Sequence, residues 1–348
     1  MELFSINSYV GVDIGSSGIK MVELKKENDY VRLLTYGFSD NFDSKIGGEW
    51  QGMDVKKTAR MINKIRGKAG IASKAIVAAL PTYSVFSSII NISNVAQKDL
   101  SSAIQWEAKK VIPLPLDDMV IEWKIIEEAS KDKPSINTKI LLTGAPRVLV
   151  TKYIEIFKEA KLNLLCLETE TFSLIRSLFG NDQSTAMIVE MGTNTSDIII
   201  VSKGIPVINR SIDVGGITIT RAIGSSLNIG MERSEQFKYD LGVSFISERE
   251  EVIPKIITDA LSPLINEIKY VINLYQNKGN EKVEKIVLSG GSSLLPNFIN
   301  YLSKLLDIKV IIGDPWARIS YPLDLKPVLE EIAPRISVAI GLAMREIE

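Results

Sequence analysis

The chain has 348 residues, of which 45% are hydrophobic and 24% are charged, and 41 Lys and Arg nearly balance 42 Asp and Glu to give a net charge of −1. This length favours about two globular domains. A charge near zero creates no field that would attract nucleic acid or an anionic membrane, so we expect no nucleic-acid partner.

The sequence contains no histidine and a single cysteine, Cys166. These counts exclude histidine-based nucleophile systems, internal disulfides and the usual zinc sites. Any chemistry must use carboxylates, lysines, backbone amides and a hard cation such as Mg²⁺ bound through oxygen. The N-terminal residues do not resemble a signal peptide, and no apolar run reaches the roughly 20 residues that a membrane span requires. We therefore expect a cytoplasmic chain with no direct membrane insertion.

The first motif in chain order is a glycine-rich hairpin, Val-Gly-Val-Asp-Ile-Gly-Ser-Ser-Gly-Ile-Lys, at residues 10–20. Asp13 ends an apolar strand, and Gly15, Ser16, Ser17 and Gly18 form a turn of small residues. The backbone N–H groups of such a turn can approach an anion closely. The two commonest phosphate fingerprints are absent, so a plain hairpin turn is the alternative.

The segment that follows the hairpin predicts a meander, a helix and then a compact insert. Apolar periodicity gives strands at 30–38, 75–80, 85–92, 119–127 and 139–143, and helices at 53–69 and 149–160. A further helix, 100–111, has its apolar stripe opposite Trp106, which either packs on a neighbouring subdomain or anchors a protein partner. A Pro-rich apolar bend follows at 112–116.

The hairpin pattern returns in the second half as Ile-Val-Glu-Met-Gly-Thr-Asn-Thr-Ser-Asp at residues 188–197. Glu190 and Gly192 follow Asp13 and Gly15 at one constant offset, because 190 − 13 and 192 − 15 are both 177. A repeat of this period indicates two similar halves. Two such hairpins facing each other would hold a polyphosphate from both sides.

The remainder of the chain adds two more glycine-rich turns. Gly215 and Gly216 open a predicted helix, whose N-terminus is another feature that favours an anion. Ser-Gly-Gly-Ser at 289–292 follows a predicted strand, 285–288. The other elements predicted here are strands at 162–167 and 206–212 and helices ending at 179 and spanning 217–225, 232–241, 255–277, 295–306 and 337–347.

In combination, the two hairpins and the two turns resemble the superfamily of actin, heat-shock chaperones and hexokinase, over nearly the whole chain. The resemblance implies an α/β fold of two duplicated RNase-H-like (actin-like) domains around a central nucleotide cleft that binds ATP and Mg²⁺. It also implies the roles of individual residues. Asp13 would orient Mg²⁺. The β-phosphate would be held by Gly15, Ser16, Ser17, Gly18 and Lys20, and the γ-phosphate by Gly192, Thr193, Asn194 and Thr195. Adenine would lie on the backbone of Gly290 and Gly291, with Ser292 after them.

Four acidic and basic residues complete the site that the resemblance implies. Glu235 and Lys238 match the ribose and adenine contacts, with an exposed i,i+3 ion pair as the alternative. Glu170 matches the residue that contacts the attacking water or the metal, with a solvated acid at a helix N-terminus as the alternative. Glu190 stands where the superfamily usually has Asp, which puts ATP hydrolysis in doubt more than ATP binding. ATP binding is expected, and slow hydrolysis stays open.

Within the superfamily the chain resembles the PilM family of type IV pilus assembly proteins, relatives of the division protein FtsA. The resemblance rests on short segments: the start Met-Glu-Leu-Phe, Gln-Trp-Glu-Ala at 105–108 leading into the bend at 112–117, Leu-Pro at 295–296 and Val-Ala-Ile-Gly-Leu-Ala at 338–343. The insert at 75–161 is of the kind that PilM and FtsA share.

The expected subdomains follow from this likeness. The first core subdomain (1A) would consist of residues 1–74, 162–184 and about 326–348, and the inserted subdomain (1C) would consist of 75–161. The second core subdomain (2A) would consist of 185–230 and 283–325, and a helical subdomain (2B) would consist of 231–282.

The family likeness implies a partner and a function. PilM proteins bind the N-terminal cytoplasmic tail of PilN, a bitopic inner-membrane protein, in a groove beside the insert, and Trp106 and the bend are candidate walls of that groove. We expect an ATP-binding scaffold of the pilus platform, peripheral on the inner membrane, whose nucleotide state sets the angle between its halves. Other platform proteins and self-association are further partners to consider.

Two other functions compete with the scaffold. A small-molecule kinase of the superfamily would need an Asp base above a substrate pocket, and it leaves the insert without a role. An FtsA-like membrane filament protein would carry a linker and an amphipathic membrane helix after its closing helix, and we expect neither here.

Overall fold

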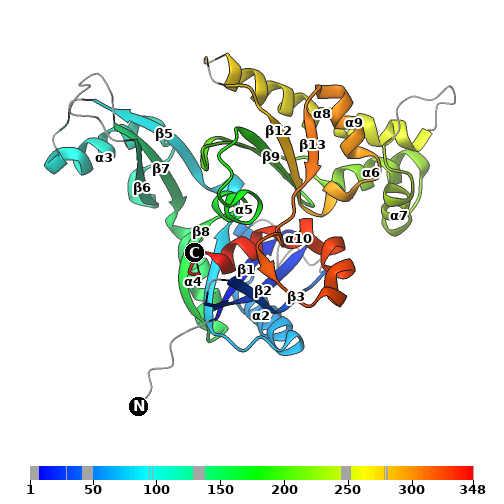
Figure 1. Cartoon of the computed structure of the whole chain (residues 1–348), viewed down its shortest axis with the longest axis horizontal. Coiled ribbons are helices and arrows are strands. Elements are labelled where there is room, and N and C mark those ends of the chain that lie inside the picture. Colours follow the sequence, from blue (N-terminus) through cyan, green and yellow to red (C-terminus); the bar gives the residue numbers. More distant parts are fainter. Residues whose placement is uncertain are drawn as a thin grey trace.

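The computed structural model describes residues 8–28, 30–40, 50–93, 95, 97–127, 138–243, 252–277, 279 and 281–347. Three sheets and the helices around them make up this part of the chain (Figure 1). The expected α/β fold of two actin-like halves is confirmed by the two larger sheets and by the structural neighbours reported below. The start Met-Glu-Leu-Phe lies outside the described residues.

The first-half sheet has six strands in the order β14-β3-β2-β1-β4-β8. The bounds are β1 (Ser8–Gly15), β2 (Gly18–Glu27), β3 (Tyr30–Phe38), β4 (Ala75–Leu80), β8 (Asn163–Thr169) and β14 (Ile319–Ser320). Strands β1, β2 and β3 form the predicted antiparallel meander, in which Asp13 pairs with Lys20 and Gly15 with Gly18. β14 was not predicted, because two residues are too short for a periodic signal.

The second-half sheet repeats the hairpin. Its order is β11-β10-β9-β12-β13, with bounds β9 (Ala186–Met191), β10 (Ser196–Ser202), β11 (Ile205–Ile212), β12 (Lys285–Ser289) and β13 (Lys309–Ile312). β9 and β10 are antiparallel, and Glu190 pairs with Asp197. This pair stands where Asp13 and Lys20 stand in the first hairpin, because 197 − 20 is again 177.

The predicted insert, 75–161, contributes to two sheets, because β4 pairs with β1 and β8 in the first-half sheet. A separate three-stranded sheet, β5-β7-β6, is built from β5 (Phe86–Ile92), β6 (Met119–Glu127) and β7 (Thr138–Pro146). From here on, the insert means the segment from β5 to β7. Helix α3 (Leu100–Val111) packs Leu100, Ile104 and Ala108 against this sheet, as its predicted stripe requires. Trp106 lies on the other face with 64% of its surface exposed, next to Lys110, whose Nζ lies 5.9 Å from the centre of the indole ring.

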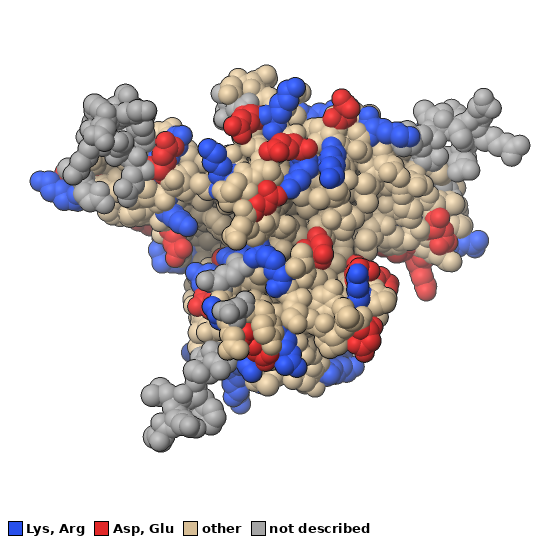
Figure 2. Space-filling model, viewed as in Figure 1, with Lys and Arg blue, Asp and Glu red and all other residues tan. Residues whose placement is uncertain are grey.

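The other helices surround the two large sheets. They are α2 (Val55–Ala69), α4 (Arg147–Glu159), α5 (Glu170–Phe179), α6 (Gly216–Leu227), α7 (Met231–Leu241), α8 (Val252–Gln276), α9 (Phe298–Leu306) and α10 (Lys326–Met344). Within the described ranges, no helix is both long enough and apolar enough to cross a bilayer. Basic and acidic side chains are interspersed over the face shown in Figure 2.

The predicted closing helix at 337–347 is longer than the sequence indicated. α10 begins at Lys326, and Pro334 lies inside it, where proline usually ends a helix because it has no N–H to donate. The carbonyl of Pro334 instead accepts a hydrogen bond from the N–H of Gly290 in the second half, at 2.9 Å. Pro334 therefore lies where α10 contacts the turn after β12.

Two glycines let α10 approach its neighbours closely. A Cβ at Gly341 would overlap the backbone carbonyl of Ser173 in α5, and a Cβ at Gly11 in β1 would overlap the carbonyl of Ala339. α10 therefore packs backbone against backbone on the first-half sheet and on α5, near the centre of the molecule (Figure 1).

We predict opposite effects for the same substitution in two helices. Gly341→Ala should lower the free energy of unfolding by about 1–3 kcal/mol or more, because the new methyl overlaps the backbone of α5. Gly67→Ala in α2 has no atom within 4 Å of the new methyl and should raise it by about 0.5–1 kcal/mol through helix propensity. Urea unfolding of both variants tests this, and a stabilised Gly341→Ala protein would contradict the packing described for α10.

Candidate functional site

A cleft of about 1090 Å³ lies between the two large sheets and is lined by both hairpins. The ends of β1 and β9 and the turn after β12 all open into it. The predicted site residues that line it are Asp13, Gly15, Ser16, Ser17, Lys20, Glu170, Glu190, Gly192, Thr193, Asn194, Thr195, Gly216, Glu235, Lys238, Gly290, Gly291 and Ser292. The structure thus brings together residues that are far apart in the sequence.

Gly18 and Gly215 do not contribute to the described lining of the cleft. Gly18 has a φ of +146°, and a Cβ there would overlap the carbonyl of Ser39. A Cβ at Gly215 would overlap the carbonyl of Thr193. Both glycines shape the loops behind the cleft and are not placed to contact a ligand directly.

The first amides of α6 are hydrogen-bonded to the second hairpin. The N–H of Gly216 donates to the carbonyl of Gly192 at 3.0 Å, and the N–H of Ile217 donates to that of Thr193 at 2.9 Å. The N–H of Gly215 faces the hydroxyl of Thr218 at 3.3 Å. These bonds use the amides that a phosphate would need, so the two glycines hold the second hairpin in place.

The first hairpin balances its own charge. Lys20 Nζ donates to Asp13 Oδ2 at 3.0 Å, and both side chains are largely buried. Burial disfavours the charge on Lys20, but the Asp13 carboxylate outweighs it, so the pKa of Lys20 rises above its ordinary value. The lysine therefore stays charged at the mouth of the hairpin, where it can meet an anion.

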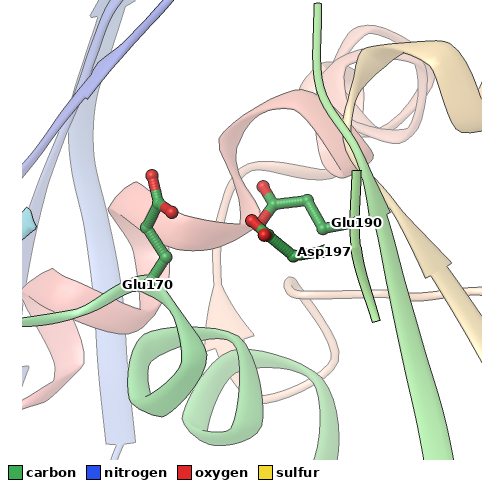
Figure 3. A group of neighbouring side chains, drawn as sticks. All are labelled: Glu170, Glu190 and Asp197. Atoms are coloured by element: carbon green, nitrogen blue, oxygen red, sulfur yellow. The ribbon is translucent and has the colours of Figure 1, made fainter. Parts of the chain in front are cut away.

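The second hairpin concentrates negative charge instead. Glu190 in β9 and Asp197 in β10 lie opposite each other, and Glu170 at the start of α5 approaches them from the first half (Figure 3). One carboxylate oxygen of each residue lies within 4.8 Å of those of the other two. Three acids from the two halves thus converge on one point; we call them the acid triad.

Crowding and burial shift the pKa values of the acid triad upward. Burial, with Asp197 and Asp13 nearby, raises the pKa of Glu170 from an ordinary 4.5 to about 8. Burial raises that of Asp197 from 3.8 to about 6, against hydrogen bonds from Ser211 and Thr82. Burial and the other acids raise the pKa of Glu190 well above its ordinary value. Without a cation, burial and crowding shift each of these groups toward its protonated form.

The acid triad fits a hard divalent cation. Its donors are all carboxylate oxygens, which Mg²⁺ prefers, and Glu190 Oε2 is buried without a hydrogen-bond partner among the described residues. Asp13 was the predicted metal residue, and it lies close enough for its charge to raise the pKa values of Glu170 and Glu190. Asp13 and the triad could therefore hold Mg²⁺ directly or through water.

Glu170 is partly buried and is anchored by a residue of the first half. Its Oε2 accepts hydrogen bonds from the N–H of Thr82 at 2.8 Å and from the hydroxyl of Thr82 at 2.9 Å. Thr82 itself is 4% exposed. Glu170 therefore faces the cleft from a fixed position.

The far end of the cleft is formed by α6, α7 and the turn after β12. Lys238 pairs with Glu235 at 2.7 Å and donates to Thr220 Oγ1 at 3.1 Å. Lys238 is 2% exposed, whereas the Glu235 side chain is 46% exposed, so only the lysine of this ion pair is buried. Gly290 has a φ of +82°, and a Cβ there would overlap the backbone of Met191. Arg335 of α10 lies beside Gly291.

Sequence reasoning missed two residues that line the cleft, Asp197 and Tyr153, and Thr82, which holds Glu170 from behind the cleft. Asp197 follows Lys20 by the same 177 residues, so comparing this further pair of residues across the repeat would have found it. Thr82 follows a proline and carries no motif. Tyr153 has the spacing of a core residue in α4, yet it lines the cleft and its buried hydroxyl has no partner among the described residues. Burial and the charges of Glu170 and Asp13 raise its pKa well above the ordinary value.

We predict that Glu170→Gln changes the pH dependence of stability. Because the folded pKa of Glu170 is raised to about 8, the folded state binds a proton that the unfolded state loses above about pH 4.5, and stability falls from there to about pH 8. The variant should flatten this fall and gain about 1–3 kcal/mol at pH 9, with no gain at pH 4. Urea unfolding across this range measures the effect.

The matched control is Glu155→Gln on the exposed face of α4, which should leave the profile unchanged. A Glu170→Gln profile parallel to that of the wild type would contradict the assigned environment of Glu170.

Comparison with known proteins identifies the family to which the chain belongs. The chain is similar to a solved PilM-PilN type IV pilus biogenesis complex, with a TM-score of 0.83 and 21% identity over 98% of both chains. It is also similar to MreB5 of Spiroplasma citri bound to AMPPNP, with a TM-score of 0.54 and 13% identity over 99% of this chain and 97% of the other.

Sequence comparison agrees with the structural one. The cell division protein FtsA of Borreliella burgdorferi is 22% identical over 98% of this chain and 91% of its own length. The family described as type IV pilus assembly protein PilM matches residues 11–347. The chain therefore belongs to the PilM family of actin-like type IV pilus assembly proteins.

Proposed function

We propose that this protein is an ATP-binding scaffold on the cytoplasmic face of the type IV pilus assembly platform. The observation that supports nucleotide binding is the pair of glycine-tipped hairpins that line one cleft from opposite halves, with Lys20 at the first and the acid triad at the second. Backbone amides and Lys20 would hold the phosphates, and Mg²⁺ would balance the carboxylates.

The acid triad favours slow ATP hydrolysis. A general base must be unprotonated to accept a proton from water, and the pKa of Glu170 is about 8 in the protein alone. A bound cation would lower this pKa by favouring the carboxylate. Glu190 also places its carboxylate one bond farther from the backbone than an aspartate would, and catalytic geometry tolerates such displacement poorly. We propose that the nucleotide serves mainly to set conformation.

The proposed partner is a PilN-like membrane protein that offers its N-terminal cytoplasmic tail. One of the similar structures is a PilM-PilN complex. A short tail buries few side chains, so it gains affinity from backbone hydrogen bonds to an outer strand of a sheet. Membership of the PilM family favours this role over that of a small-molecule kinase.

We propose that the tail binds at the corner between β8 and β6. β8 is the outer strand of the first-half sheet, and β6 is the outer strand of the insert sheet. The charge of Glu122 in β6 contributes to the raised pKa of Cys166 in β8. Leu165 of β8 is 40% exposed and offers an apolar contact. β8 ends at Thr169, directly before Glu170, so the same strand reaches the cleft.

The nucleotide site is tested by Asp13→Ala. Loss of this carboxylate should abolish the rise in melting temperature that ATP and Mg²⁺ give to the wild type, because the cation loses its contact in the first half. Asp324→Ala, at an exposed position in another part of the chain, is the control and should respond as the wild type does. An unchanged ATP response of Asp13→Ala would remove Asp13 from the site.

The position of the tail is tested by placing one charge at each of two surfaces. Leu165→Arg should weaken binding of a peptide of the partner's N-terminal residues by about tenfold or more, whereas Trp106→Arg on α3 should change it by less than about twofold. Isothermal titration calorimetry measures both. The reverse result would place the tail on the outer face of α3.

A further inference from the structure

We propose that Thr82 connects the acid triad to the insert and so transmits the nucleotide state to the partner-binding region. This inference rests on the proposed function, because it names the residue through which the cleft and the tail site communicate. Thr82 is a positioning residue, since it acts through Glu170 and not on the nucleotide.

The contacts of Thr82 place it between the two halves. Its N–H and its hydroxyl both donate to Glu170 Oε2, at 2.8 and 2.9 Å. The hydroxyl gives its one proton to Glu170 and also lies close enough to Asp197, which belongs to the second half, to lower the pKa of that carboxyl. One hydroxyl thus faces acids from both sides of the cleft.

Thr82 also occupies one of the two links between the insert and the rest of the first half. The short helix η2 (Thr82–Ser84) joins β4 to β5, and the other link is the direct passage from β7 into α4. Strand β11 of the second half contacts both η2 and β5. A shift of η2 would therefore move the edge of the insert sheet.

A small polar cavity gives η2 room to move. It has a volume of about 220 Å³ and lies between η2, the start of the insert and β11, lined by Thr82, Tyr83, Val85, Ser87, Asn209 and Ser211. Ser211 donates to Asp197, so the cavity also adjoins the acid triad on its second-half side. Hydroxyl and amide groups around it can exchange partners with water at little cost.

A cation bound by the acid triad would change what Glu170 offers to Thr82. In the protein alone, Glu170 Oε2 takes both hydrogen bonds from Thr82. Glu170, Glu190 and Asp197 would hold such a cation, and Glu170 would then share its carboxylate between the cation and Thr82. A change in the position of this carboxylate would be passed to Thr82 through the two hydrogen bonds, and so to η2.

The test compares three Thr82 proteins in the full chain. Thr82→Val removes the hydroxyl but keeps the N–H and the shape, and Thr82→Ser restores the hydroxyl. The readout is the ratio of the affinities of the tail peptide measured with and without ATP and Mg²⁺. We expect this ratio to fall to about one in Thr82→Val and to stay at the wild-type value in Thr82→Ser, with ATP affinity changed by less than about threefold in both.

A matched control separates this role from general destabilisation. Thr171→Val removes a hydroxyl that is also buried, next to Glu170, and that accepts a hydrogen bond from Asn209 at 2.9 Å. Because Thr171 does not lie in either link to the insert, this variant should keep the wild-type ratio. If the ratio of tail affinities became about one in both valine variants, Thr82 would have no specific role, and the inference would be overturned.

The remaining outcomes are distinguishable. A wild-type ratio in Thr82→Val overturns this inference and leaves the proposed function intact. A wild-type protein whose tail affinity does not depend on nucleotide overturns both this inference and the proposed switch. Loss of ATP binding in Thr82→Val makes Thr82 part of the nucleotide site and overturns its role as a connection.

Hydrogen exchange in β5 and β7 on addition of ATP and Mg²⁺ gives an independent readout, and equal protection of these strands in wild type and Thr82→Val overturns the inference.

Discussion

Repulsion between carboxylates that belong to different halves is the constraint on which the cleft depends. Duplication has placed a pair of facing residues at the same position in each hairpin, Asp13 with Lys20 and Glu190 with Asp197. The first pair neutralises itself, whereas the second leaves two negative charges side by side. Glu170 adds a third from the opposite half. Like charges at this distance require protons or a cation, so the charge state of the cleft bears directly on how closely the halves can approach.

The halves are held together differently at the two ends of the cleft. At one end α10 makes backbone contacts that side chains cannot replace, including the bond from the N–H of Gly290 to the carbonyl of Pro334. At the other end a side-chain hydrogen bond crosses between the halves, from Asn209 of β11 to Thr171 of α5 at 2.9 Å, and β11 contacts η2 and β5. The acid triad lies next to this second contact, because Glu170 directly precedes Thr171.

The sequence predicted the parts of the fold that local patterns encode. Both hairpins, the insert and the stripe of α3 follow from alternation, glycine turns and helical spacing. The misses are interactions between distant segments: β14 forms only because β3 is available as a neighbour, and α10 continues through Pro334, whose carbonyl meets the second half. The same holds for Tyr153, which lines the cleft, and for Thr82, which holds Glu170 at its edge, because both gain their places from contacts that no spacing records. Asp197 is the exception, because the repeat itself contained its signal.

The charge pattern also bears on whether such a protein acts as a motor or as a scaffold. Fast hydrolysis needs a base that is ionised when water attacks, and here the candidate base shares its site with two other acids that oppose its ionisation. A cation that relieves this repulsion is itself held by the same carboxylates, which leaves fewer lone pairs for activating water. Holding the cation and activating water thus compete for one set of oxygens. A site built in this way favours long-lived nucleotide states, and a long-lived state suits a protein whose proposed task is to hold a partner in one of two geometries.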